Sequence, residues 1–175
     1  MKLLALSGSL RKNSYNTAAL QALKTLAPES IDIALGDIGG LPLFNPDREM
    51  ETIPELEALK RLLGEASGII IASPEYAHGI SGPLKNALDW LVSGVEFPYK
   101  PIMLINTSPR AFHALEALRE VLVTMSGHII ESACVSIPLL SSEYGVTEIL
   151  ENEEMATALS AAVDNFYHEI LKKDD

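Results

Sequence analysis

The chain is poor in cysteine, in positive charge and in long apolar runs. It has one cysteine in 175 residues, so it can form no internal disulfide, which fits a reducing compartment. Its 13 lysines and arginines stand against 24 aspartates and glutamates, and the net charge of −11 disfavours nucleic acid or an anionic membrane as a partner. No apolar run approaches the roughly 18 residues that span a bilayer. We therefore expect a cytoplasmic protein.

The sequence also lacks internal repeats, low-complexity tracts and any stretch that resembles an interdomain linker. Hydrophobic residues make up 47% of the chain, and its length suffices to bury a continuous core. We expect residues 1–175 to form a single domain. The stretch 36–52, which contains Gly39, Gly40, Pro42 and Pro46, has no sustained periodicity and is predicted to be a long loop.

Short apolar runs of the strand type alternate with segments of helical period. The predicted strands are Leu3–Leu6, Ile31–Leu35, Gly68–Ala72, Ile102–Ile105 and Ile129–Ile137. Runs such as 69–72 do not alternate apolar with polar residues, which is typical of parallel strands buried on both faces. An amphipathic stripe from Met155 to Ile170 predicts a long final helix. The pattern predicts an α/β fold of five parallel strands and five helices, with helices on both faces of the sheet.

The loop after the first strand, residues 8–17, has the composition of an anion site. It contains three hydroxyls, a guanidinium and an amide, from Ser9, Ser14, Thr17, Arg11 and Asn16. A helix that begins here presents unpaired N–H donors and a partial positive charge, which suits a monophosphate. The loop lacks Gly-x-Gly-x-x-Gly and Gly-Lys-Ser/Thr, so a mononucleotide fits better than a dinucleotide or a triphosphate. The alternative is that Ser14 or Asn16 only caps the helix, with Arg11 and Lys12 solvated.

The loop after the third strand, residues 73–83, combines prolines, glycines and aromatic rings. Gly79 and Gly82 permit a close approach of the backbone, so a flat ring can lie against this loop beside Tyr76. The alternative is an ordinary turn with Tyr76 on the surface. Both loops follow parallel strands, and in doubly wound sheets ligands bind at these carboxyl ends, where the strand order reverses. The two loops therefore predict one pocket.

Three segments resemble the NADPH-dependent FMN reductase family, which is similar to bacterial chromate, quinone and azo-dye reductases. They are Gly8-Ser9-Leu10-Arg11 with Ser14 and Asn16, then Pro74-Glu75-Tyr76, then Leu84-Lys85-Asn86-Ala87-Leu88-Asp89-Trp90. The resemblance spans most of the chain. It implies a flavodoxin-like three-layer sandwich with the strand order 2-1-3-4-5, an FMN bound between the two loops, and NADPH or NADH as the hydride donor.

The resemblance also assigns residues to the cofactor. It implies that the FMN phosphate is held by Ser9, Arg11, Ser14, Asn16 and Thr17. It implies that the isoalloxazine ring is walled by Pro74, Glu75, Tyr76, Ala77, His78 and Gly79. In the loop after the fourth strand Ser108 matches the family, whereas the segment Arg110–His113 lacks the family's glycines, and its bulkier side chains would either narrow access to the flavin or move the nicotinamide site. Many relatives have asparagine where this chain has Ala77, and alanine serves equally if the contact is through the backbone.

The implied activity is an NAD(P)H-dependent, ping-pong reduction of a quinone, a flavin, an azo compound or a metal oxyanion. Because the cofactor carries the chemistry, no catalytic residue is assigned, and no metal-ligand spacing occurs in the sequence. The resemblance further suggests a homodimer or homotetramer. Two alternatives stay open: an electron carrier like a flavodoxin, without its own NAD(P)H oxidation, and a binding protein that has lost the flavin.

Three further residues draw attention by their type. Cys134 lies in an apolar strand pattern and is predicted to be a buried structural thiol rather than a nucleophile. Trp90 is predicted to serve packing or a subunit contact. His78 has two possible roles: it orients an acceptor or donates protons to it, or it only completes its loop. Both stay open, because no base partner for His78 is identifiable in the sequence.

Overall fold

The main strands form a parallel sheet in the order β2-β1-β3-β6-β7, with β8 also paired to β6. The structure, a computed structural model, describes residues 1–108, 112–140 and 142–174. The strands are β1 (Lys2–Ser7), β2 (Asp32–Gly36), β3 (Gly68–Ala72), β4 (Glu75–Tyr76), β5 (Gly79–Ile80), β6 (Pro101–Asn106), β7 (His128–Ile129) and β8 (Val135–Ser136). The helices are α1 (Tyr15–Leu26), α2 (Pro54–Glu65), α3 (Gly82–Leu91), α4 (His113–Thr124), α5 (Val146–Glu151) and α6 (Glu153–Asp174), with 3₁₀ turns at Pro46–Arg48 and Glu131–Ala133.

The central strands are buried on both faces, as their uninterrupted apolar sequences predict. All five residues of β3 are buried, and so are the first five of β6. In the register of the sheet Leu4 pairs with Ile69, and Ile70 pairs with Met103. The strand order confirms the predicted 2-1-3-4-5 topology, in which β6 is the fourth strand and β7 with β8 the fifth.

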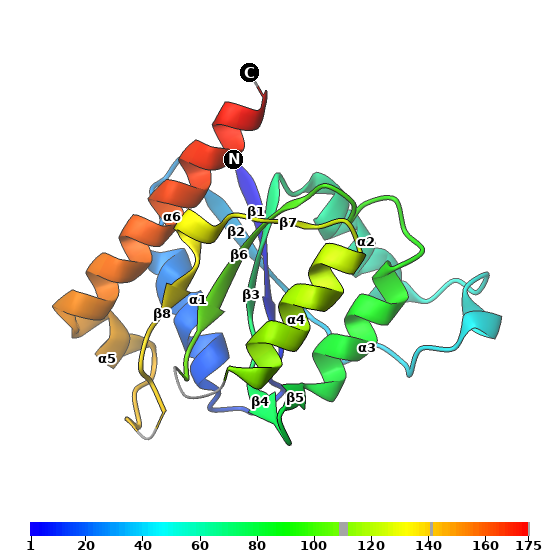
Figure 1. Cartoon of the computed structure of the whole chain (residues 1–175), viewed down its shortest axis with the longest axis horizontal. Coiled ribbons are helices and arrows are strands. Elements are labelled where there is room, and N and C mark those ends of the chain that lie inside the picture. The colour runs from blue at the N-terminus through cyan, green and yellow to red at the C-terminus, as the bar shows by residue number, and fades with distance from the viewer. Residues whose placement is uncertain (109–111, 141, 175) are drawn as a thin grey trace.

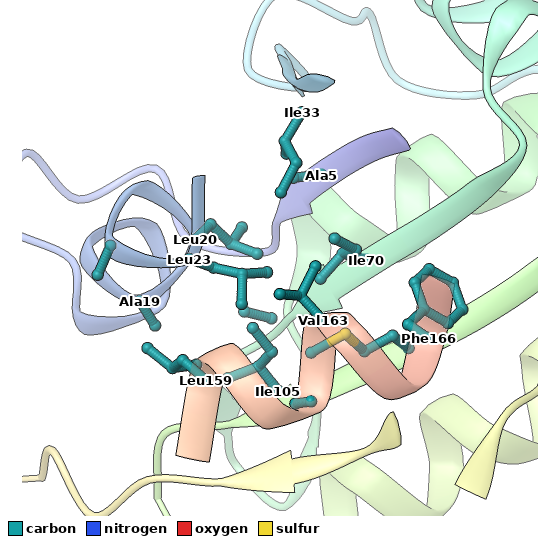
Figure 2. Close-up of a cluster of buried hydrophobic side chains, with 14 of the residues drawn as sticks. Ala5, Ala19, Leu20, Leu23, Ile33, Ile70, Ile105, Leu159, Val163 and Phe166 are labelled. Atoms are coloured by element: carbon teal, nitrogen blue, oxygen red, sulfur yellow. The ribbon is translucent and has the colours of Figure 1, made fainter. Parts of the chain in front are cut away.

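Successive side chains of a strand point to opposite faces, so the sheet divides the apolar core in two. On one face Ala5, Ile33, Ile70 and Ile105 pack against α1 and α6, through side chains such as Leu20 and Leu23, and Leu159, Val163 and Phe166, all drawn in Figure 2. On the other face Leu4, Leu6, Ile69 and Ile71 pack against apolar side chains of α2, α3 and α4. Figure 1 shows the resulting three layers. The predicted flavodoxin-like sandwich is confirmed.

The fifth strand differs from its prediction. The sequence predicts a continuous strand over 129–137, but the structure has two two-residue strands, β7 and β8, on either side of the turn Glu131–Ala133. Glu131 and Ser132 are exposed, and the turn places these polar side chains outside the core while Ile130 and Ala133 stay buried. Both pieces pair only with β6 among the described strands, so the edge of the sheet accommodates the break.

The C-terminal region also has more elements than predicted. A short helix, α5, precedes the long α6, and the two are separated at Asn152. The Oδ1 atom of Asn152 accepts a hydrogen bond from the N–H of Met155 at 3.0 Å, so this residue caps a new helix. The predicted stripe from Met155 to Ile170 lies within α6. The predicted loop 36–52 is confirmed, apart from the turn Pro46–Arg48 and one residue of β2 at its start.

Candidate functional site

A hollow of about 340 Å³ lies where the loops after β1, β3 and β6 meet, and pockets of roughly this size hold small ligands. It is lined by Ser9, Arg11, Ser14, Tyr15, Asn16, Pro74, Glu75, Tyr76, Thr107, Ser108 and Leu140. The chain leaves β1 for α1 on one face of the sheet and leaves β3 toward α3 on the other face. The hollow therefore occupies the switch point at which ligands bind in open α/β sheets.

Ser14 both caps α1 and lines the hollow. Its Oγ accepts a hydrogen bond from the N–H of Thr17 at 3.3 Å, so Ser14 is the N-cap of α1 as well as a residue of the lining. The Oγ1 of Thr17 lies 2.8 Å from the Oγ of Ser7, and Thr17 itself is not part of the lining. The helix therefore begins at the wall of the hollow, with its partial positive charge toward it.

Arg11 supplies the cationic side of the hollow. Its backbone N–H donates to the Oγ of Ser9 at 3.4 Å, which fixes the bend of the loop. Over residues 1–108, 112–140 and 142–174, no carboxylate forms an ion pair with its guanidinium. In a chain of net charge −11 a cation that lines a pocket without a carboxylate partner can meet an anionic ligand.

Hydrogen bonds tie the three loops to one another. The buried Ser81 donates from its Oγ to the carbonyl oxygen of Gly8 at 2.6 Å and thus joins the first loop to the second. Thr107 donates from its Oγ1 to the Oδ1 of Asn16 at 3.0 Å and joins the third loop to the start of α1. Asn16 and Thr107 are both buried. The walls of the hollow are therefore fixed relative to one another by the protein itself.

Gly8 is required at this junction for a steric reason. A Cβ atom at this position would lie 2.7 Å from the Oγ of Ser73 and 3.1 Å from its Cα. Since one of these atoms is backbone, any side chain would push the first loop away from the second. The absence of a side chain at Gly8 is what permits the Ser81 hydrogen bond.

The second loop contains a small hairpin that the sequence did not predict. Strands β4 and β5 pair antiparallel, with Glu75 opposite Ile80 and Tyr76 opposite Gly79. The two residues at the tip, Ala77 and His78, have φ angles of 49° and 58°, as a two-residue hairpin turn of this kind requires. The hairpin presents Glu75 and Tyr76 to the hollow.

The carboxylate of Glu75 is engaged at both oxygens. Its Oε2 accepts from the N–H of Ala114 at 2.9 Å, and its Oε1 lies 3.0 Å from the Nδ1 of His78. The hydrogen bond from Ala114 is the main reason that the pKa of Glu75 is lowered, and His78 and His113 lower it further. His78 therefore has a carboxylate partner that the sequence did not reveal.

The structure brings together eight of the twelve predicted cofactor residues at the hollow. These are Ser9, Arg11, Ser14, Asn16, Pro74, Glu75, Tyr76 and Ser108. The other four, Thr17, Ala77, His78 and Gly79, belong to the same two loops but are not part of this lining, and Ala77 and His78 are exposed at the tip of the hairpin. The prediction about the segment Arg110–His113 falls in part on residues 110 and 111, which lie outside the described residues.

Three lining residues were missed by sequence reasoning. Tyr15 and Thr107 are direct neighbours of predicted residues, Ser14 and Ser108, and adjacency was the available signal. Leu140 comes from the segment after β8 and carries no motif. Its neighbour Leu139 donates its N–H to the carbonyl oxygen of Thr107 at 3.1 Å, which holds this segment beside the third loop.

Trp90 and Cys134, which the sequence predicted to have structural roles, both lie outside the hollow. Trp90 is 2% exposed, donates from Nε1 to the carbonyl oxygen of Pro42 at 2.8 Å and meets Phe44 edge to face. Its packing role is confirmed. Cys134 is half-buried rather than fully buried, and burial raises the pKa of its thiol. A raised pKa makes the thiolate scarce, which fits a structural role.

Two kinds of feature are absent from the described part of the chain. No group of three or more histidines, cysteines or acidic residues there is arranged to hold a metal ion. Nor is any helix among the described residues long and apolar enough to cross a membrane.

The sheet is flavodoxin-like, and at its edge a helix start with a cation and several hydroxyls lies opposite a hairpin that carries an aromatic ring. These features define the class of mononucleotide-binding α/β proteins. Comparison with known proteins narrows that class. Residues 1–140 match the model of the NADPH-dependent FMN reductase family. The chain belongs to this family, and the predicted resemblance is confirmed. It is thus an oxidoreductase of a family that binds FMN and uses NAD(P)H as the hydride donor.

Individual relatives agree with this assignment. The NAD(P)H-dependent FMN reductase PA1204 of Pseudomonas aeruginosa is 38% identical over 134 residues, which cover 73% of this chain and 72% of the relative. A quinone reductase of Pseudomonas putida is 33% identical over 177 residues, covering 91% and 89%. Alignments with four other relatives span about half of each chain. Among solved structures, FerB, a flavoenzyme NAD(P)H:(acceptor) oxidoreductase from Paracoccus denitrificans, has a TM-score of 0.82 at 25% identity, covering 98% and 97% of the two chains.

Proposed function

We propose that the hollow binds FMN between the start of α1 and the β4–β5 hairpin. The observation that carries this proposal is the donor set: Arg11 has no carboxylate partner among the described residues, and it stands beside Ser9 and the first turn of α1. This set suits a phosphate dianion. At the other end Pro74 and Tyr76 offer flat and apolar surface, which suits the isoalloxazine ring.

The remaining predicted residues are proposed to support the lining residues or to border the hollow. Thr17 supports Ser7 and Ser14, which shapes the phosphate end. Ala77, His78 and Gly79 form the tip and return strand of the hairpin that carries Tyr76. Ser108 donates its N–H to the Oδ1 of Asn106 at 2.9 Å and borders the hollow. Asn16 is proposed to border the phosphate while it bonds Thr107.

When bound, FMN supplies the hydride-accepting and electron-donating chemistry, and this chain supplies the position and the electrostatics. Nicotinamide and acceptor are expected to enter the same hollow in turn, which predicts ping-pong kinetics. We propose a quinone as the acceptor, because the P. putida relative is named a quinone reductase. Free flavins, azo compounds and metal oxyanions are the other acceptors to assay.

The test is the visible spectrum of the purified protein with FMN and, separately, with riboflavin, followed by anaerobic NADPH and then NADH. We expect FMN to bind, riboflavin to bind more weakly because it lacks the phosphate, and either donor to bleach the bound flavin. Flavin that binds without bleaching would instead favour an electron carrier. No flavin binding at all would overturn the proposal in favour of a binding protein that has lost the cofactor.

We further propose that residues 1–175 act as a single domain in the cytoplasm, in a homodimer or homotetramer. Tyr76 and Leu140 at the hollow are exposed apolar side chains, and Leu10 and Phe112 are exposed in the first and third loops. Burial of such side chains between subunits would stabilise an oligomer. Sedimentation velocity at micromolar concentration tests this, and a monomeric mass would contradict it.

A further inference from the structure

The β4–β5 hairpin at the hollow is too small to hold its own shape. Each strand has two residues, and isolated hairpins are marginal in water even when they are longer. Its tip places two residues with side chains, Ala77 and His78, in the left-handed region, where glycine or asparagine is favoured. A short hairpin with a strained tip needs an anchor outside itself.

The first turn of α4 needs a partner as well. The N-cap residue of this helix is Phe112, whose side chain has no hydrogen-bond acceptor. The first N–H groups of a helix have no partner within the helix. The carboxylate of Glu75 reaches from the hairpin and accepts the N–H of Ala114 at 2.9 Å. Figure 1 shows the hairpin against the start of α4.

One side chain thus meets both needs. Glu75 caps α4 through Oε2 and holds the tip of its own hairpin through His78 at Oε1. The side chain of Glu75 is 13% exposed and that of His78 is 76% exposed, so the bond to Ala114 is the more shielded of the two. The ring of His78 also contacts the ring of His113, the first residue of α4, edge to face, with the two ring centroids 4.6 Å apart. The carboxylate of Glu75 therefore bonds to both the helix and the tip of the hairpin, and the two histidine rings add a second contact between them.

We propose that Glu75 is a positioning residue for the flavin ring: it clamps the β4–β5 hairpin to α4 and so fixes Tyr76 against the hollow. This inference rests on the proposed function, because it concerns the wall of the same site. Glu75 acts here through the bonds of its carboxylate to the backbone N–H of Ala114 and to the ring of His78. The clamp also links the ring wall to the helix that follows the third loop, so a change at either one is transmitted to the other.

The test compares Glu75→Ala, Glu75→Gln and a matched control, Asn152→Ala. Asn152 also accepts an N–H in the first turn of a helix, but it lies at the start of α6, away from the hollow. Three quantities are measured: hydrogen exchange of the Ala114 amide without flavin, the affinity for FMN, and the visible spectrum of the bound flavin.

With Glu75→Ala we expect the Ala114 amide to exchange faster and the affinity for FMN to fall about tenfold, the factor for loss of one charge-assisted hydrogen bond. The spectrum of the bound flavin is expected to move toward that of free flavin. Glu75→Gln keeps an acceptor for Ala114 and should recover most of the loss. The control should speed exchange at Met155 and leave the flavin spectrum unchanged.

A second variant keeps the inference testable if Glu75→Ala folds poorly. Ala77→Asn relieves the tip, so the double variant Glu75→Ala/Ala77→Asn should fold and recover part of the FMN affinity. Unchanged FMN affinity and spectrum in Glu75→Ala, with normal binding by the unmodified chain, would overturn the clamp alone. Failure of the unmodified chain to bind FMN would overturn the proposed function together with it.

Discussion

At the scale of single residues, several side chains of the site both line the hollow and form a bond that holds the fold. Ser14 caps a helix and lines the hollow, Asn16 lines the hollow and bonds Thr107, and Glu75 joins two elements while it faces the hollow. Residue types and local spacing indicated the first two positions. The partners of Glu75 were not predictable, because Ala114 lies 39 residues away in sequence and offers only its backbone.

The role of Arg11 can be measured directly. Replacing it with alanine removes a charged donor to the phosphate, which should weaken FMN binding by about 1–3 kcal/mol. Riboflavin has no phosphate, so its affinity should not change. Lys12→Ala is the control, because Lys12 has the same charge in the same loop but does not line the hollow. Equal losses for FMN and riboflavin, measured by fluorescence titration, would contradict the assignment.

The conformation of Ala77 predicts that substitution there can stabilise the protein. Its φ of 49° is costly for alanine, whereas asparagine tolerates the left-handed region. We expect Ala77→Asn to raise the free energy of unfolding by about 0.5–1 kcal/mol, and Ala77→Val to lower it because a β-branched residue is disfavoured there. Urea denaturation of both variants checks the sign. If both variants changed the free energy of unfolding in the same direction, the backbone of Ala77 would not be strained.

At the scale of elements, the strands and helices that were predicted well are those with long, one-sided or continuous apolar patterns. β1, β3 and β6 are examples, since their sequences have no polar interruption and burial decides their structure. The misjudged elements are short and depend on tertiary contacts. The break between β7 and β8 is stabilised in part by α6, where Asn165 donates from Nδ2 to the carbonyl oxygen of Ser132 at 3.3 Å.

The packing of α6 on β3 predicts the effect of a single methyl group. A Cβ at Gly68 would lie 2.8 Å from Cζ of Phe166 and 2.9 Å from Cδ1 of Ile170. Gly68→Ala should therefore force α6 outward and lower the free energy of unfolding by about 1–3 kcal/mol. Gly82→Ala is the control, because no heavy atom lies within 4 Å of its Cβ position. Denaturant unfolding should separate the two variants, and equal stabilities would disprove the close packing.

At the scale of the whole molecule, the charge of the chain opposes the charge of its proposed cofactor. The net charge of the chain is −11 and the FMN phosphate is anionic, so long-range repulsion slows the approach of FMN to the protein. Arg11 attracts the phosphate only at short range. Salt screens the long-range part first, since the Debye length falls from about 30 Å at 0.01 M to about 8 Å at 0.15 M.

This balance predicts that added salt speeds the binding of FMN. The association rate constant of FMN should rise, by about two- to tenfold, over that range of salt. The rate for uncharged riboflavin should stay flat and serves as the control. Stopped-flow quenching of flavin fluorescence measures both rates. A rate for FMN that falls with salt would show that the local positive field at the hollow dominates.

The hydrogen bonds that join the three loops also set when the site can exist. Gly8 and Ser81 are 73 positions apart, and Asn16 and Thr107 are 91 positions apart. Such distant pairs close late, because chain entropy must be overcome before they form. A growing chain on the ribosome has no pocket until β6 and the residues after it have emerged. Flavin is thus expected to bind only after β6 has joined the sheet, and a retained flavin would show that this step of folding has been completed.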